Sequence, residues 1–269
     1  MLRWFSALAV FAASLPLGGT AETPTPFPNF EAKRVRPPQP GTRERITIQI
    51  EEPEAQAVIG DGATEAGEND AAGQLVGRYS WFWEKVSPEL AASGPGRLDE
   101  ALLVLAGGET VTAPRLQLMQ DIASAQGVSI LTSSIGTKVS PALVLAVIAV
   151  ESAGQVDAVS SAGAQGLMQL MPDTAVRFDV EDVLAAQQNI QGGVKYLDWL
   201  MEKFGGDPVL VLAGYNAGEG SIRDHQGVPP FPETRDYVPL VLAAFQVAKG
   251  LCLTPPQLIS GGCVFRTMK

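Results

Sequence analysis

The pattern of apolar and polar positions is helical through the second part of the chain, and it is most distinctive at residues 142–150, where nine consecutive positions are apolar. Ser140 is a good N-cap, and Pro141 suits the first turn of a helix. A helix that is apolar on all sides is normally buried, and this one is far shorter than the about 20 residues that span a bilayer. The pattern therefore predicts a buried helix that ends at a single carboxylate, Glu151.

Further helices follow from periodicity and from their start and stop signals. The periodic apolar positions and the proline and glycine boundaries predict helices over residues 98–106, 114–126, 189–204, 209–213 and 233–249. Pro239 lies inside the last of these, where we expect a kink or a restart. Tyr215 and Asn216, flanked by glycines, are expected in a loop at residues 214–218. Since no strand ladder is evident, the globular part is predicted to be mainly α.

The N-terminal 73 residues do not show this pattern. Residues 1–21 have a positive start, an apolar stretch and the small-residue site Gly19-Thr20-Ala21, which predicts a cleavable signal peptide; the alternative is an uncleaved membrane anchor. Residues 22–73 are rich in proline and then in acidic residues, glycine and alanine. That composition predicts a disordered linker.

Two further segments flank the central part. Residues 74–130 are predicted as an N-terminal helical segment that begins with aromatic residues between Tyr79 and Trp83. We expect these rings to form core or docking contacts; the alternative is that they stack on sugars or on a partner. Residues 251–269 form a tail with the only two cysteines, Cys252 and Cys263. In an oxidising compartment these two cysteines are expected to form a disulfide.

Composition excludes several functional classes. The formal net charge of −10 leaves no basic excess for displacing counterions from nucleic acid, so no nucleic-acid partner is expected. Two cysteines and one histidine, His225, cannot supply a structural zinc site by themselves. The sequence implies no metal or organic cofactor. A Ser-His-Asp site would depend entirely on His225, which lies in a polar turn and is expected to be an exposed loop residue.

Glu151 is the candidate for chemistry. Burial disfavours the charged form of a carboxylate and raises its pKa, and an acid that keeps its proton near neutral pH can donate it to a leaving group. The alternative is that Glu151 merely marks the point at which a core helix reaches water. The helix alone does not decide between the two interpretations.

Short motifs along the chain bear on this choice. In order, they are Glu151-Ser152, Gly-Leu-Met-Gln-Leu-Met-Pro at residues 166–172, Tyr215-Asn216-Ala217-Gly218 and Glu233-Thr234-Arg235-Asp236-Tyr237-Val238, with Asn189-Ile190 and Tyr196-Leu197 between them. Together they resemble the soluble lytic transglycosylase catalytic domain (family 1, Slt-type, of the lysozyme-like superfamily). The resemblance implies a mainly α, lysozyme-like (goose-lysozyme/Slt-type) catalytic domain over residues 131–250, preceded by the additional N-terminal helices and the disordered linker.

The resemblance also implies an activity. The expected reaction is cleavage of the MurNAc-β-1,4-GlcNAc bond of peptidoglycan with formation of 1,6-anhydromuramyl products, in the periplasm. Glu151 would be the only catalytic carboxylate, serving first as acid and then as base, while the substrate's N-acetyl group stabilises the intermediate. Two-carboxylate glycosidases need a partner about 5–9.5 Å away, and Asp157 is the nearby candidate; a substrate-assisted mechanism removes that need.

The same resemblance implies the substrate-binding residues. Positions that match the family's motifs are Ser160, Gln169, Met171, Tyr215, Asn216, Glu233 and Tyr237. Four of them have a purely structural alternative: Met171 as core, Tyr237 as a residue that closes the domain, Ser160 as a turn residue and Glu233 as a solvated residue at a helix start. One departure from the family pattern is Gly214, where alanine is usual, and it is expected to loosen the loop slightly.

Two rival functions remain open. A hydrolytic muramidase of goose-lysozyme type would need Asp157 or Glu233 to activate water. A catalytically idle glycan-binding or assembly module would bind peptidoglycan glycan strands without turnover, and a cell-envelope machine is then a candidate partner of the N-terminal region.

Overall fold

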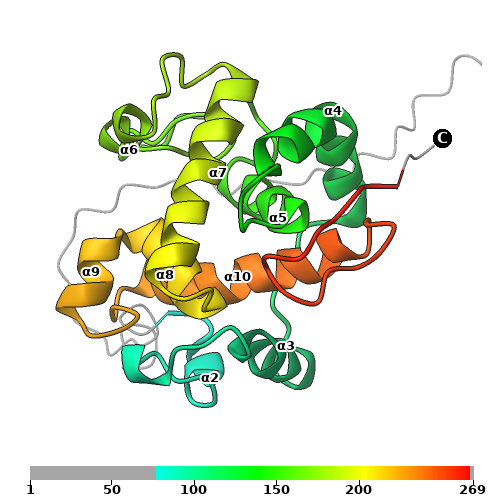
Figure 1. Cartoon of the computed structure of the whole chain (residues 1–269). Helices are drawn as coiled ribbons and strands as arrows, with labels where there is room; N and C mark the ends of the chain where they lie inside the picture. Colours follow the sequence, from blue (N-terminus) through cyan, green and yellow to red (C-terminus); the bar gives the residue numbers. More distant parts are fainter. Residues whose placement is uncertain (1–76, 267–269) are drawn as a thin grey trace, which may run out of the picture. The chain divides into compact units, whose positions relative to one another are not determined.

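The computed structural model describes residues 77–266 (Figure 1). They belong to the second of two compact units, Ala63–Lys269. The predicted signal peptide, the predicted linker, the first residues of the predicted N-terminal helical segment and the end of the tail lie outside the described residues.

Within the described part the chain is helical, and its only β structure consists of isolated bridges. This confirms the mainly α prediction. The elements are α2 (Ser80–Trp83), the 3-10 helix η1 (Leu90–Ala92), α3 (Arg97–Gly107), α4 (Leu116–Ser134), α5 (Pro141–Glu151), α6 (Pro172–Arg177), α7 (Ala186–Lys203), α8 (Pro208–Ala217), α9 (Glu219–Asp224) and α10 (Pro232–Lys249). No helix among residues 77–266 combines the length and the apolarity needed to cross a membrane.

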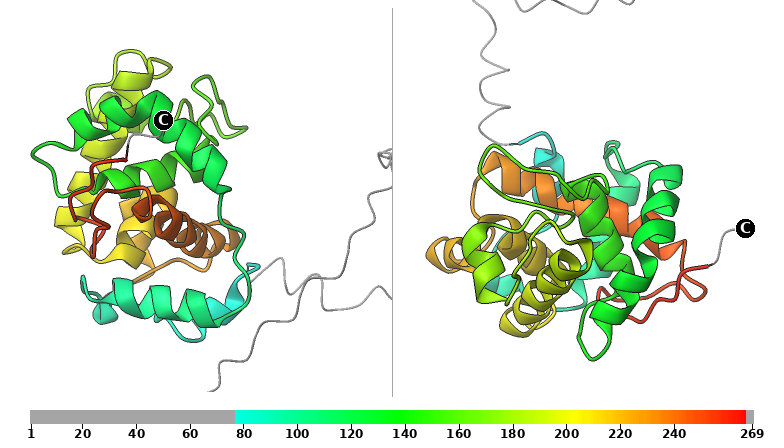
Figure 2. Two further views of the ribbon diagram at one scale, coloured as in Figure 1. Left: turned by 90° about the vertical axis from the view of Figure 1, so that its right-hand side faces the viewer. Right: turned by 90° about the horizontal axis from the view of Figure 1, so that it is seen from above.

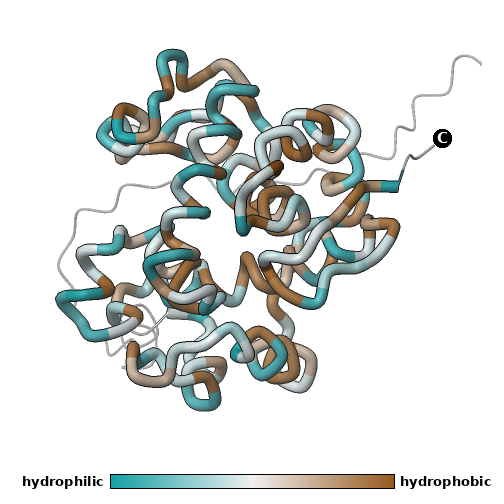
Figure 3. Tube along the Cα trace, in the orientation of Figure 1, coloured by the Kyte–Doolittle hydropathy of each residue, from teal (hydrophilic) through white to brown (hydrophobic). Residues whose placement is uncertain are grey.

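Helix α5 forms at the predicted residues and lies at the centre of the core. Ser140 Oγ accepts a hydrogen bond from the Ala142 amide at 3.3 Å, and Pro141 occupies the first turn. Every residue from Pro141 to Ala149 is buried, so each large side chain contributes about 1.5–3 kcal/mol of hydrophobic stabilisation. Helices α10 and α4 pack against it (Figures 1 and 2), and strongly hydrophobic stretches meet where α5 approaches α10 (Figure 3).

Helix α8 corrects the prediction for residues 214–218. Asp207 caps its first turn, accepting a hydrogen bond from the Leu210 amide at 2.8 Å, but the helix continues to Ala217. Tyr215 and Asn216 therefore lie in its last turn, and only Gly218 leaves the helix, at a φ of 78°. Gly214 does not loosen a loop: a Cβ there would lie 2.8 Å from the Phe204 ring. The glycine allows α8 to approach the end of α7 closely.

Helix α10 runs through Pro239 as one helix, so the restart considered from the sequence does not occur. A proline inside a helix leaves the carbonyl four residues earlier without its usual donor. Here that carbonyl belongs to Arg235, and it accepts a hydrogen bond from the indole Nε1 of Trp83 at 2.8 Å. A partner distant in sequence thus satisfies the group that Pro239 frees.

The N-terminal segment is part of the same core. Phe82, Val86 and Leu98 are fully or almost fully buried, which confirms that the aromatic cluster supplies core contacts. The helical part of the cluster is only four residues long. Helix α4 extends well past its predicted end, to Ser134.

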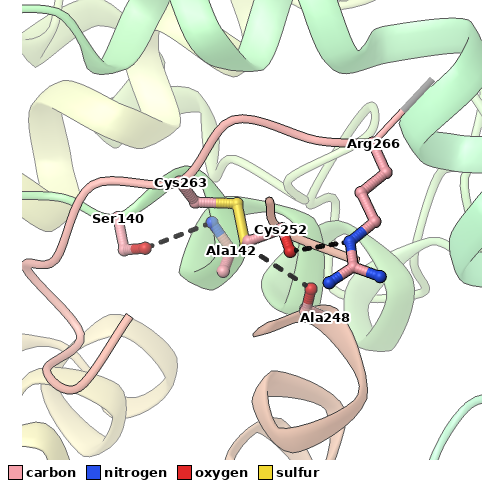
Figure 4. The surroundings of a disulfide bond; sticks show 6 residues. All are labelled: Ser140, Ala142, Ala248, Cys252, Cys263 and Arg266. Carbon is pink, nitrogen blue, oxygen red and sulfur yellow. Dashed lines mark hydrogen bonds between the residues drawn. A yellow bond between two sulfur atoms is a disulfide. The ribbon is translucent and has the colours of Figure 1, made fainter. Parts of the chain in front are cut away.

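The tail is closed by the predicted disulfide, Cys252–Cys263 (Figure 4). Between the two cysteines, the carbonyl of Ile259 accepts a hydrogen bond from the Ser140 amide at 2.8 Å. The disulfide-closed loop therefore packs against the start of α5.

Candidate active site

Glu151 is the last residue of α5, and this end of the helix is held from two sides of the fold. Tyr237, on α10, donates a hydrogen bond from its hydroxyl to Glu151 Oε1 at 2.7 Å. The next residue, Ser152, donates from its hydroxyl to the Leu167 carbonyl at 2.8 Å. The end of α5 is thereby joined both to α10 and to the segment that follows Gly166.

The environment of Glu151 favours its protonated form. Burial raises the pKa of Glu151 from 4.5 to about 7; the hydrogen bond from Tyr237 lowers it, and the nearby charge of Glu233 raises it. Desolvation is the largest of these effects. A carboxyl group with a pKa near 7 is partly protonated at neutral pH and can act as a general acid. This supports the catalytic interpretation over a carboxylate that simply reaches water.

Two tyrosines close to the acid, Tyr237 and Tyr215, remain neutral. Burial and the charge of Glu151 raise the pKa of Tyr237 and of Tyr215 well above the ordinary value. Tyr215, on α8, donates its hydroxyl hydrogen to the Met168 carbonyl at 2.8 Å, and its ring centroid lies 5.2 Å from that of Tyr196. Because Tyr237 keeps its proton, it remains a donor to the Glu151 carboxylate.

A cavity of about 240 Å³ brings several predicted site residues together. Its walls come from the segment before α6, from α7 and from the end of α8; the lining residues are Gln169, Leu170, Met171, Thr174, Tyr196, Tyr215, Asn216, Ala217 and Gly218. Met171 is 44% exposed, so it is not a core residue. A larger cavity of about 370 Å³, bordered by Lys138 and Leu258, contains none of the predicted site residues.

The wall that carries Gln169 is rigidly held. Gln169 adopts a left-handed backbone conformation (φ 48°), and its side-chain Nε2 donates to the carbonyls of Gly166 and Ala158 at 2.8 and 3.1 Å. Asn189 is fully buried and accepts from the Met168 amide at 2.7 Å, while its Nδ2 donates to two carbonyls of neighbouring loops. Sequence analysis noted Asn189 within a motif but assigned it no role.

A second group links α8 to α10. Thr234 donates its hydroxyl hydrogen to Asn216 Oδ1 at 2.7 Å, and Asn216 Nδ2 donates to Glu233 Oε1 at 3.4 Å. Glu233 itself is exposed. Sequence analysis did not single out Thr234, although it lies within the motif at residues 233–238. Its buried hydroxyl determines which way the Asn216 amide faces.

Ser160 is not brought into contact with these groups. Its hydroxyl accepts from the Ala164 amide at 3.0 Å, and the two residues are also paired through their backbones. This arrangement fits the turn interpretation. Asp157 is exposed on the same loop. His225 is exposed, as expected, at the end of α9, and residues 77–266 contain no group of three or more His, Cys, Asp or Glu side chains placed to hold a metal ion.

Part of the chain is similar to known proteins. Residues 131–238 match the family model described as "Transglycosylase SLT domain". The chain is 34% identical over 131 residues to a soluble lytic murein transglycosylase of Salmonella typhimurium, covering 40% of this chain and 20% of that protein. It is 41% identical over 80 residues to a membrane-bound lytic murein transglycosylase F of Maricaulis maris, covering 28% and 18%.

A solved structure is also similar. It is that of an inactive mutant of the lytic transglycosylase Slt from Pseudomonas aeruginosa, with 26% identity, a TM-score of 0.46 and coverage of 68% of this chain and 34% of that one. The matches to the two curated relatives span about a fifth of the length of those proteins.

Proposed function

We propose that the chain is an exported peptidoglycan lytic transglycosylase that cleaves the MurNAc-β-1,4-GlcNAc bond and forms a 1,6-anhydromuramyl end. The match of residues 131–238 to the transglycosylase SLT domain supports this proposal. One observation carries the proposal: a single acid, Glu151, ends a buried helix with a pKa of about 7 and a hydrogen bond from Tyr237. The exposed Asp157 is not in a comparable environment. This asymmetry suits a reaction that needs one carboxyl group.

In the first step, the protonated Glu151 donates its proton to the glycosidic oxygen as the bond from C1 of MurNAc to that oxygen breaks. The GlcNAc product leaves with a new hydroxyl, and the carbonyl oxygen of the muramyl N-acetyl group stabilises the positive charge at C1. Glu151 is then a carboxylate. The Tyr237 hydroxyl stabilises this charged form, because a hydrogen bond to an ionised group is stronger than one to a neutral group.

In the second step, the C6 hydroxyl of MurNAc attacks C1 and gives its proton to Glu151. An internal ether closes the 1,6-anhydro ring, no water is consumed, and Glu151 returns to its protonated state. Since the nucleophile belongs to the same sugar, its attack is intramolecular. A second carboxylate for activating water is not needed.

The cavity lined by Gln169 and Tyr215 provides the proposed sugar-binding surface. Its lining combines Tyr215 and Met171 with the amide residues Gln169 and Asn216. Such a mixture of apolar and polar side chains suits a sugar ring, which has apolar faces and a polar edge. Glu233 is placed by its contact with Asn216 and is proposed to meet the muramyl sugar from the α10 side.

The test is product analysis by mass spectrometry after incubation with purified sacculi. Wild type should release anhydromuropeptides, and Glu151→Gln, which keeps the shape but has no transferable proton, should release none. Glu202→Gln is the matched control, because Glu202 is exposed on α7 and is not among the residues that line the cavity containing Tyr215. Reducing ends formed with water would refute the transglycosylase reaction in favour of a muramidase, and binding without products would favour an idle module.

A further inference from the structure

Residues 77–108 lie outside the stretch that matches the SLT domain, yet they pack on the two helices that carry most of the site. Helices α2 and α3 contact α10, and α3 also contacts α8. Figures 1 and 2 show this segment along one side of α10. The hydrogen bonds from this segment to α10 fall on Arg235 and Asp236, at the end of the helix that carries Tyr237.

Asp236 is the first attachment point. Its carboxylate accepts from the Arg78 amide at 2.7 Å, from Arg78 Nε at 2.9 Å and from the Tyr79 amide at 3.3 Å. Only 14% of the Asp236 side chain is exposed. The chain can approach this closely because residue 77 is a glycine at a φ of 83°, where a Cβ would lie 2.9 Å from Asp236 Oδ1.

Trp83 is the second attachment point. Its indole nitrogen supplies the donor that the Arg235 carbonyl lacks because of Pro239, and its ring lies 4.6 Å beneath the Arg235 guanidinium. The guanidinium in turn donates to the carbonyls of Val228 and Pro229 at 2.8 and 2.9 Å. Arg235 and Asp236 are thus both held by residues 77–83, immediately before Tyr237.

A third attachment is made at the start of α8. The buried carboxylate of Asp207 accepts from the Gly94 amide at 2.7 Å and from Arg97 Nη1 at 2.9 Å, in addition to capping its own helix. Arg97 also donates to the Ser87 carbonyl. The other end of α8 carries Tyr215 and Asn216, so the same N-terminal segment contacts both helices that face Glu151.

From this we infer that residues 77–97 are a positioning element of the catalytic site: by holding Arg235 and Asp236 on one side of α10, they set the rotation of the helix that brings the Tyr237 hydroxyl onto Glu151 on the other side. The inference rests on the proposed function for its catalytic readout. Successive residues of a helix point about 100° apart, so a fixed Asp236 restricts where Tyr237 points. Displacement of a positioned group by about 1 Å can cost about a hundredfold in rate.

The experiment compares Asp236→Ala, Asp236→Asn and Trp83→Phe in the full chain. Phe245→Leu is the matched control: Phe245 is fully buried farther along α10, so the substitution lowers stability without touching residues 235–237. At a temperature where all variants are folded, Asp236→Ala should lower kcat/KM on solubilised glycan strands by about tenfold or more. Asp236→Asn, which keeps an acceptor for the Arg78 and Tyr79 amides, should recover part of the loss.

The double variant Asp236→Ala/Tyr237→Phe separates positioning from general destabilisation. If the segment acts through Tyr237, the double variant should lose less kcat/KM than the product of the two single-variant losses. The reason is that substitutions of residues acting as a unit do not have additive free-energy effects. Multiplicative losses, or a loss in Phe245→Leu as large as in Asp236→Ala, would overturn the inference. Trp83→Phe provides the same comparison if Asp236→Ala does not fold.

Amide hydrogen exchange supplies a readout that does not need turnover. The two variants are compared under conditions that give them the same free energy of unfolding. The amide hydrogens of peptides spanning residues 232–238 should then exchange faster in Asp236→Ala than in Phe245→Leu. Equal exchange would overturn the positioning role. An inactive wild type would count against the proposed function alone, because the exchange comparison would still report on the segment.

Discussion

Replacement of Glu151 by Gln should stabilise the protein at neutral and alkaline pH and have little effect at acid pH. In the wild type, burial raises the pKa of the Glu151 carboxyl from 4.5 to about 7. Between these two values the unfolded chain has released its proton while the folded protein retains it. The folded state binds more protons there, so the free energy of unfolding falls as pH rises through this window.

The magnitude follows from the shift in pKa. The difference between 4.5 and about 7, at about 1.4 kcal/mol for each pKa unit, corresponds to about 3 kcal/mol of stability lost by the wild type above pH 7. Gln has no ionised form and no such loss, and its side-chain oxygen can still accept the hydrogen bond from Tyr237. For a folded unit of this size, about 3 kcal/mol corresponds to about 6–12 °C in Tm.

The assay is urea and thermal unfolding of both proteins at pH 4 and pH 8. The Tm of Glu151→Gln should exceed that of wild type by several degrees more at pH 8 than at pH 4. All other titrating groups are common to both proteins, so their effects cancel in the comparison. Glu202→Gln, which replaces an exposed carboxylate on α7, is measured alongside as the control variant. A difference in Tm that is the same at both pH values would refute the argument that burial of the Glu151 charge destabilises the folded wild type.

Three further substitutions test the Tyr237 hydrogen bond, the disulfide and the buried Asn189. Tyr237→Phe removes the hydrogen bond that lowers the pKa of Glu151. Because hydrogen bonds to charged groups contribute about 1.5–3 kcal/mol, the alkaline limb of the pH profile of kcat/KM should move to higher pH by about one unit. An alkaline limb at the wild-type pH would contradict this prediction. The double variant Cys252→Ser/Cys263→Ser should lower the free energy of unfolding by about 2–3 kcal/mol, because the disulfide joins residues 11 apart in sequence and so restricts the unfolded chain. An unchanged midpoint of urea unfolding would contradict this prediction. Asn189→Ala should cost about 2 kcal/mol or more by leaving the Met168 amide and the Val183 carbonyl without partners. Denaturant unfolding that matched wild type would show that water or neighbouring groups replace the amide.

Much of the fold could be predicted because its signals are local. The N-cap Ser140, the proline after it and the continuous apolar run predicted α5 from end to end. The alternation of apolar positions similarly predicted α7 and α10 to within a few residues. The end of α8 was predicted wrongly because glycine is a helix-stop signal in isolation, whereas Gly214 is retained in the helix by its packing against Phe204.

The candidate site was predictable in part. The motifs contain Glu151 and most of the residues that line the cavity, but the sequence did not indicate that Thr234 orients Asn216. Such contacts join groups whose separation in sequence is unrelated to their distance in space. No local propensity reports them.

The sequence by itself determined the helical periodicity, the burial of α5 and the placement of one acid at its end, because these depend on residue types within a few turns of helix. Only the tertiary structure decided that Tyr237, 86 residues away, donates to Glu151, and that Trp83 completes the hydrogen bonding of α10 around Pro239. These pairings require several helices to pack at particular angles and rotations. Packing of that kind is a property of the whole core rather than of any one segment.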